Sequence, residues 1–172
     1  MKKETIYLAG GCFWGTEKYI SLIPGVLSTE VGYINGKRET VTYEQVCRED
    51  TGHAETVRVE FDADRLPLTE LLTLFFDAID PLTVNRQGND VGTQYRTGIY
   101  YADAAQKSAI DAALGTLAAQ FDSPLAIEAL PLLNYCRAEE YHQKYLEKNP
   151  SGYCHIGLSE FVRLAAKVKR LQ

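Results

Sequence analysis

A cysteine between a strand and a helix is the first candidate for chemistry in this sequence. Cys12 lies in Gly10-Gly11-Cys12-Phe13-Trp14-Gly15, after a short apolar alternation and before a helical pattern. The partial positive charge of a helix N-terminus lowers the pKa of a thiol and favours the nucleophilic thiolate. One alternative is a cysteine that only fills the core. A phosphate-binding loop has the same glycine separation, but its consecutive Lys-Ser/Thr pair does not follow Gly15.

Glu55 is the second candidate, because the alternation of the chain places it on an apolar face. It is in phase with Val57, Val59 and Phe61, so we expect it at the end of the buried face of a strand. Burial disfavours a carboxylate and raises its pKa, which lets the acid stay protonated near neutral pH. On the strand pattern alone, a solvated glutamate just before the strand is the simpler interpretation.

The elements that must position these residues alternate between strands and helices. The order strand, helix, strand, strand, helix, strand, helix, strand predicts an α/β (α+β) two-layer sandwich with helices on a mixed sheet, close to a ferredoxin-like or split βαβ core. We expect one catalytic domain over residues 1–172, with residues 149–172 forming an irregular segment and a C-terminal helix. Residues 83–96 and 149–158 fit no regular pattern, which favours a functional role for both. The expected elements are strands at 5–9, 27–33, 56–61, 99–101 and 125–129, and helices at 13–23, 68–79 and 110–121.

Composition and charge exclude several classes of protein. The 172 residues carry 18 Lys and Arg against 23 Asp and Glu, a net charge of −5, which disfavours nucleic acid as a main partner. No apolar run is as long as a membrane span, and the N-terminus lacks the apolar stretch of a secretory signal. We therefore expect a cytoplasmic monomer whose four cysteines are thiols rather than structural disulfides.

Several sequence blocks resemble the A-type peptide methionine sulfoxide reductases. They follow that family's order and run from residue 10 to about residue 157, which is nearly the whole chain. This ordered set is far more specific than any one pentapeptide. The blocks are Gly11-Cys12-Phe13-Trp14-Gly15, Tyr43-Glu44-Gln45-Val46-Cys47, Thr51-Gly52-His53-Ala54-Glu55, Gly88-Asn89-Asp90-Val91-Gly92-Thr93-Gln94-Tyr95-Arg96 and Tyr141-His142-Gln143-Lys144-Tyr145-Leu146.

The resemblance implies reduction of methionine S-sulfoxide, free and in proteins, to methionine. By this resemblance the Cys12 thiolate attacks the sulfoxide sulfur and becomes a sulfenic acid, while Glu55 protonates the oxygen. The resemblance also implies groups that contact the substrate. These are the hydroxyls of Tyr43 and Tyr95 at the sulfoxide oxygen, the rings of Phe13 and Trp14 around the methyl group, and the carboxylate of Asp90, which positions the substrate.

The resemblance further implies that a second thiol recycles Cys12. Cys154 in Gly152-Tyr153-Cys154 matches the resolving position, and the surrounding Pro, Ser and Gly predict a loop that swings toward Cys12. No cysteine follows Cys154. We therefore expect one Cys12–Cys154 disulfide, reduced directly by thioredoxin or by dithiothreitol in vitro, with no bound cofactor and no metal. Cys47 and Cys136 are expected to be non-catalytic, and a role for either as a backup resolver stays open.

Three other interpretations compete with this one. Cys12 and Cys154 could serve another thiol enzyme, such as a peroxidase. The chain could be a non-enzymatic α/β ligand-binding domain with unreactive thiols. A zinc site is weak, because the sequence has no C-x-x-C pair. His142 and Tyr145 have helical spacing, and we expect both to be structural.

Overall fold

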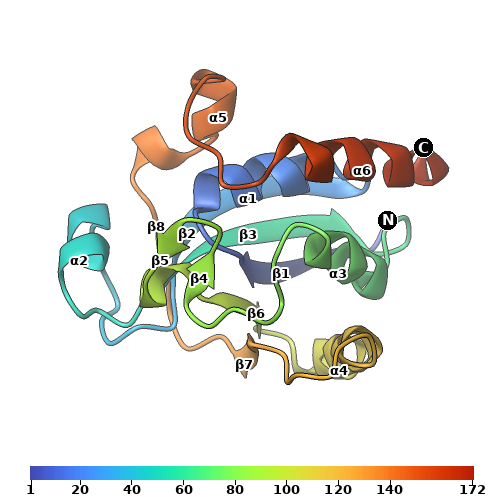
Figure 1. The fold of residues 1–172 in the computed structure, drawn as a ribbon, viewed down its shortest axis with the longest axis horizontal. Helices are drawn as coiled ribbons and strands as arrows, with labels where there is room; N and C mark the ends of the chain where they lie inside the picture. Colours follow the sequence, from blue (N-terminus) through green and yellow to red (C-terminus); the bar gives the residue numbers. More distant parts are fainter.

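The computed structural model describes all residues from 1 to 172, and a six-stranded mixed sheet forms its centre (Figure 1). The strand order is β7-β6-β1-β3-β2-β8. All neighbouring strands are antiparallel except β6 and β7, which α4 joins in a parallel βαβ unit. The strands are β1 (Lys3–Ala9), β2 (Val26–Ile34), β3 (Ala54–Asp62), β6 (Thr97–Tyr101), β7 (Ile127–Pro131) and β8 (Tyr135–Arg137).

The central pair of strands follows the apolar alternation of the sequence. Ile6 and Leu8 of β1 lie opposite Val59 and Val57 of β3, so their side chains enter the core from the same face of the sheet. Glu55 begins that series on β3 and is 1% exposed. The alternation therefore places Glu55 at the end of the buried face, as the sequence predicts.

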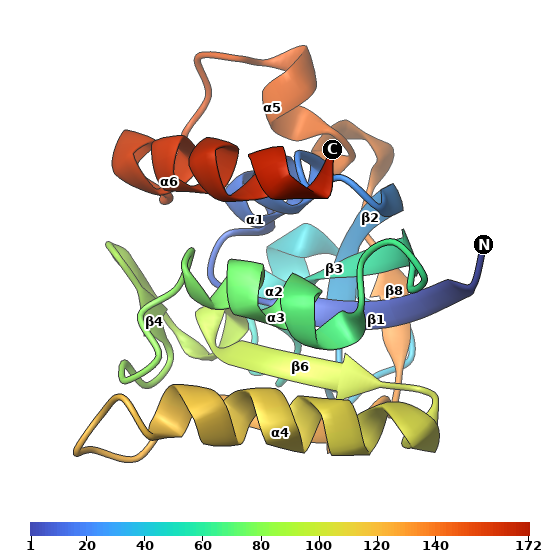
Figure 2. The same cartoon turned by 90° about the vertical axis from the view of Figure 1, so that its right-hand side faces the viewer.

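The four longer helices share one core with this face of the sheet. Figure 2 shows α6, α3 and α4 one above another, with α1 beside α6. The opposite face carries a smaller cluster around Tyr7 and Tyr100, against which Leu132 and Tyr135 pack. The predicted α/β fold with helices on a mixed sheet is confirmed. These helices are α1 (Phe13–Ser21), α3 (Leu68–Phe76), α4 (Lys107–Ala118) and α6 (Leu158–Val168).

Short elements fill residues 83–96, whereas residues 149–157 contain only turns and bends before α6 begins; other short elements lie where none is expected. Within 83–96, β4 (Arg86–Gln87) pairs with β5 (Asp90–Val91), and a single 3₁₀ turn, η1 (Thr93–Tyr95), follows. The unexpected elements are β8 and the helices α2 (Tyr43–Arg48) and α5 (Tyr145–Lys148). Each has six residues or fewer, which is too short to show a period. None of the helices has both the length and the apolar character needed to cross a membrane.

Candidate active site

Cys12 is the residue that immediately precedes α1, at the end of the loop that follows β1. Gly11 makes the turn with a φ of +86°, and a β-carbon there would lie 2.8 Å from atoms of Gln87 and His155. The thiol is buried, with 8% of the residue exposed. Burial and the Glu55 carboxylate raise the pKa of Cys12, and the backbone N–H groups of Trp14 and Gly15 only partly oppose this. The expected lowering of the thiol pKa is therefore wrong for the free protein, because desolvation outweighs the helix terminus.

The Glu55 carboxyl lies at the start of α1, and only one of its two oxygens is hydrogen-bonded. Its Oε1 accepts a hydrogen bond from the backbone N–H of Phe13 at 3.1 Å. Its Oε2 is buried and has no hydrogen-bond partner. Burial raises the pKa of Glu55 to about 8, with a smaller contribution from the Asp90 charge and an opposing one from the Phe13 N–H. At neutral pH Glu55 is therefore mostly a neutral acid, hydrogen-bonded to the residue that follows Cys12.

Two tyrosines and one aspartate from separate segments approach this pair. Tyr43 begins α2 and Tyr95 ends η1; both are half-buried, and burial first and then other groups, including the Glu55 charge, raise their pKa values. Asp90 on β5 accepts a hydrogen bond from the Tyr153 hydroxyl at 3.0 Å, while its Oδ2 is buried without a partner. The Asp90 charge also raises the pKa of the Cys12 thiol. The structure thus brings together side chains that lie more than 80 residues apart in sequence.

Several aromatic side chains surround Trp14, the residue that follows Phe13. The Trp14 indole N–H donates to His142 Nδ1 at 2.9 Å, and the indole stacks on Tyr145 with ring centres 3.7 Å apart. His142 also packs on Phe13 and Tyr43, at 5.1 and 4.4 Å between ring centres. The helical spacing that marks His142 and Tyr145 as structural gives no hint of these contacts. Both residues hold Trp14 in place.

Cys154 contacts the first turn of α1 rather than pointing into solvent. A β-carbon on Gly15 would lie 2.9 Å from its Sγ, so only a glycine allows this approach. The half-buried thiol donates to the carbonyl of Ile156 at 3.5 Å. Burial raises the pKa of Cys154, and the Lys18 charge opposes this only in part. All four cysteines are free thiols.

Comparison with known proteins identifies the family. The family model described as Peptide methionine sulfoxide reductase matches residues 4–171.

The chain belongs to the peptide methionine sulfoxide reductase family.

A relative from Lachnoclostridium phytofermentans, a peptide methionine sulfoxide reductase MsrA, is 60% identical over 158 residues, 92% of this chain and 95% of the relative. Among solved structures, Mxr1 from Saccharomyces cerevisiae in reduced form matches with a TM-score of 0.85 at 37% identity, covering 91% of this chain and 92% of that one. Mxr1 in complex with Trx2 matches with a TM-score of 0.60 at 25% identity, covering 84% and 85%. This methionine sulfoxide reductase is therefore an oxidoreductase that acts on peptide methionine sulfoxide, and the family predicted from the blocks is confirmed.

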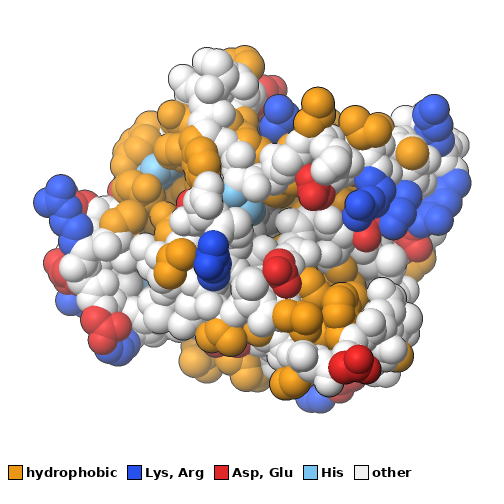
Figure 3. Space-filling view, in the orientation of Figure 1, with side chains coloured by type: hydrophobic (Ala, Val, Ile, Leu, Met, Phe, Trp, Pro, Cys, Tyr) orange, Lys and Arg blue, Asp and Glu red, His pale blue; other side chains and the backbone are white.

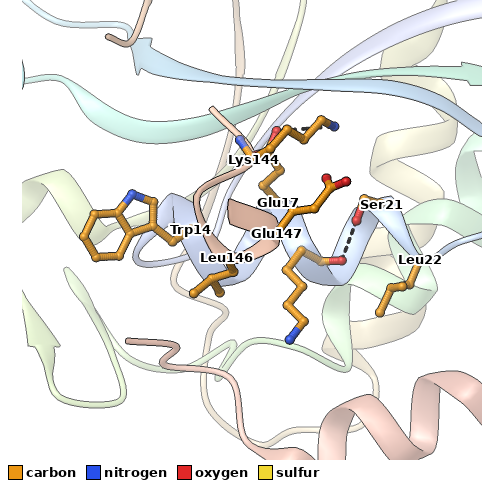
Figure 4. A pocket seen from close by; sticks show the side chains of 8 residues that line it. Trp14, Glu17, Ser21, Leu22, Lys144, Leu146 and Glu147 are labelled. Carbon is orange, nitrogen blue, oxygen red and sulfur yellow. Dashed lines mark hydrogen bonds and ion pairs between the residues drawn. The ribbon is translucent and has the colours of Figure 1, made fainter. Parts of the chain in front are cut away.

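A groove of about 390 Å³ runs from Trp14 along α1 of this reductase (Figure 4). Trp14 lies at one end and Leu22 at the other, and Lys144 and Glu147 come from the segment around α5. Glu17 lies between them, accepting the backbone N–H of Lys144 at 2.8 Å. Trp14 lines this groove, but Cys12 and Glu55 do not.

The outer surface beside the reductase site is apolar. Hydrophobic side chains gather between α2 and α5 (Figure 3). Tyr141, in the turn that precedes α5, is 57% exposed. No three His, Cys, Asp or Glu side chains are grouped so that they could hold a metal ion. Cys47 is exposed on α2, and Cys136 on β8 donates to the Val41 carbonyl at 3.5 Å.

Proposed function

We propose that the protein reduces methionine S-sulfoxide, free and in proteins, with Cys12 as nucleophile and Glu55 as acid, and that thioredoxin restores its thiols. The observation that carries this proposal is the buried Glu55 carboxyl. One of its oxygens is held by the N–H next to Cys12, and the other has no partner. A sulfoxide oxygen needs a proton donor of this kind, because sulfoxide sulfur is a poor electrophile until its oxygen is protonated.

The first step transfers the oxygen from the substrate to Cys12. The neutral Glu55 gives its proton to the sulfoxide oxygen, and the Cys12 sulfur attacks the substrate sulfur after its thiol proton passes to Glu55. The new S–S bond and the bond between the substrate sulfur and oxygen then break as the hydroxyl group passes to the Cys12 sulfur. Methionine leaves with an electron pair on its sulfur, and Cys12 becomes a sulfenic acid. The raised pKa values of both groups suit this exchange, since each starts protonated at neutral pH. The hydroxyls of Tyr43 and Tyr95 would donate to the same oxygen.

The substrate's methyl group would lie against the rings of Phe13 and Trp14. Phe13 is 1% exposed and forms the floor, while Trp14 is held by the contacts described above. The unpartnered Oδ2 of Asp90 would position the substrate from the opposite segment. Membership of the family supports the proposed preference for the S epimer at sulfur.

The second step would form a disulfide between Cys12 and Cys154. The Cys154 sulfur attacks the sulfenic sulfur, the S–O bond breaks, and water leaves. Contact of Cys154 with Gly15, three residues after Cys12, supports this pairing. A reduced dithiol partner then exchanges with the disulfide, and the similarity to Mxr1 in complex with Trx2 supports thioredoxin in that role.

We further propose that residues 1–172 act as a single catalytic domain, monomeric and cytoplasmic. Four free thiols, one of them exposed on α2, fit a reducing compartment.

The test separates the steps by counting methionine released per enzyme without a reductant. Cys12→Ser should release none. Cys154→Ser should release about one equivalent and then stop, because a separate resolver is required for recycling. Glu55→Gln should slow the release about 100-fold, the usual effect of losing a general acid, while Cys12 stays open to alkylation.

Methionine release by Cys12→Ser, or full cycling of Cys154→Ser with thioredoxin, would contradict these assignments. The same enzyme assayed with hydrogen peroxide tests the peroxidase alternative.

A further inference from the structure

His155 follows Cys154 in the chain and lies against the loop that carries Cys12, and neither the sequence motifs nor the proposed mechanism gives it a role. Its ring packs over the glycines on both sides of Cys12. A β-carbon on Gly11 would lie 2.8 Å from His155 Nε2, and one on Gly15 would lie 3.0 Å from His155 Nδ1. The residue therefore covers the loop from which the nucleophile projects.

The hydrogen bonds of His155 define which ring nitrogen carries its proton. Nε2 lies 2.8 Å from the carbonyl oxygen of Gly10. A carbonyl only accepts, so Nε2 must be the protonated nitrogen. Burial lowers the pKa of His155, which keeps the ring neutral at pH 7. Nδ1 is then a bare lone pair, and it is buried without a partner.

The free lone pair lies beside the Cys154 thiol. Cys154 Sγ and His155 Nδ1 approach the same point, the β-carbon position of Gly15, at 2.9 and 3.0 Å. The distance between Sγ and Nδ1 is therefore at most the sum of these two distances. The thiol donates to the Ile156 carbonyl at rest, but a carbonyl cannot take the proton away. His155 is the neutral base at hand when Cys154 must become a thiolate.

The geometry points to His155 as the general base that deprotonates Cys154 during disulfide formation. This inference rests on the proposed role of Cys154 as resolver. The Cys154 S–H bond breaks and its proton passes to Nδ1. The sulfur electron pair forms the S–S bond with Cys12, the S–O bond of the sulfenic acid breaks, and the leaving hydroxide takes the proton back from the imidazolium as water. The Cys12 sulfur is reduced and the Cys154 sulfur is oxidised, with no other reactant.

Charged groups from each neighbouring element face this pair. Asp90 of the β5 hairpin favours the imidazolium, and Lys18 of α1 favours the Cys154 thiolate. A cavity of about 220 Å³ beside His155 is also lined by Asp77, Asp80 and Glu160. All of these groups stay in place when His155 alone is replaced, so differences in pH profile report on the imidazole.

The test follows disulfide formation in the full-length reduced protein after one turnover on methionine sulfoxide without reductant. Rapid quenching and mass spectrometry give the disulfide rate per sulfenic acid formed, and released methionine reports the first step separately. The key variant is His155→Gln, because the glutamine amide N–H still reaches toward the Gly10 carbonyl while its oxygen is no base. We expect disulfide formation to slow about 100-fold at pH 7, and the defect to shrink as the pH rises because hydroxide then supplies the thiolate.

A wild-type disulfide rate in His155→Gln would overturn the proposal, and so would a loss of equal size at every pH, which would indicate a purely structural role. If His155→Gln does not fold, His155→Asn gives the same comparison. Cys154→Ser separates the two proposals: a Cys12 disulfide that still forms in it overturns the resolver assignment and, with it, the role of His155. Normal methionine release with slow resolution only in the His155 variants supports both.

Discussion

Replacement of Glu55 by Gln should make the protein increasingly more stable than the wild type as the pH rises. In the folded protein burial raises the pKa of Glu55 to about 8, against 4.5 for an ordinary glutamate. A carboxyl whose folded pKa is raised binds its proton more tightly in the folded state than in the unfolded state. Wild-type stability therefore falls as the pH rises between these two values and levels off above about pH 8.

The size of the effect follows from the shift itself. Each pH unit in the window changes the free energy of unfolding by about 1.4 kcal/mol, so the full shift corresponds to about 5 kcal/mol. Gln does not titrate, and its side-chain oxygen still accepts the N–H of Phe13. The two proteins should therefore be about equally stable near pH 4.5 and diverge steadily up to pH 8.

The assay is urea unfolding of both proteins between pH 5 and pH 9 in dithiothreitol, compared as a difference so that other titrating groups cancel. Glu60→Gln on the same strand is the matched control. Its pKa is lowered, chiefly by Lys3, so the stability it contributes is present above pH 4.5 and is lost only at lower pH. That difference should stay flat from pH 5 to pH 9. A flat line for Glu55→Gln as well would refute the neutral buried acid.

Three other predictions follow from the site. Methionine release should decline above about pH 8 as Glu55 loses its proton, and a pH profile without this limb would contradict its role as acid. Gly15→Ala should slow disulfide formation about 10-fold with the first turnover retained, because the added carbon would lie 2.9 Å from Cys154 Sγ. The control is Gly115→Ala, which adds a carbon in open space on α4. This variant should stabilise the protein by about 0.5–1 kcal/mol and leave the rate of disulfide formation unchanged. Trp14→Phe removes the hydrogen bond from the indole N–H to His142. The KM for the sulfoxide should therefore rise about fivefold, in line with the loss of about 1 kcal/mol. An unchanged KM would show that this hydrogen bond is not needed to hold the indole for substrate binding.

The sequence predicts those helices and strands whose apolar residues recur with a regular period. The alternation through Val57, Val59 and Phe61 gives β3, its buried face and the depth of Glu55, because a strand has only two faces. The offsets of the apolar residues give α3 and α4 to within three residues at each end. Sheet order does not follow from this pattern, since β8 joins the edge beside β2 through only three residues.

The site is harder to predict because its parts come from segments without a period. Asp90 and Tyr95 lie in a two-residue strand and a single turn, and only the family resemblance assigns them roles. His142 has the spacing of a structural residue, and its bond to Trp14 depends on how the segment around α5 folds back onto α1. The pKa of Cys12 is raised, whereas the sequence predicts that it is lowered. The local motif shows that Cys12 lies at a helix N-terminus, but it does not show the burial that outweighs the effect of that terminus.

The regular sheet and the irregular segments therefore divide the chemistry between them. Strand β3 holds the acid at a fixed depth, whereas the second thiol reaches the site on a loop and needs side-chain bonds to stay there. Tyr153 is tied to Asp90, His155 is tied to Gly10, and Cys154 between them contacts Gly15. These two hydrogen bonds lie on both sides of Cys154 along the chain, so they dock this segment while Cys12 is a free thiol. In the proposed mechanism the Cys154 thiol would then attack from a position already in contact with Gly15 rather than from a free loop, and loss of the bond that ties His155 to Gly10 should slow the second step and leave the first unchanged.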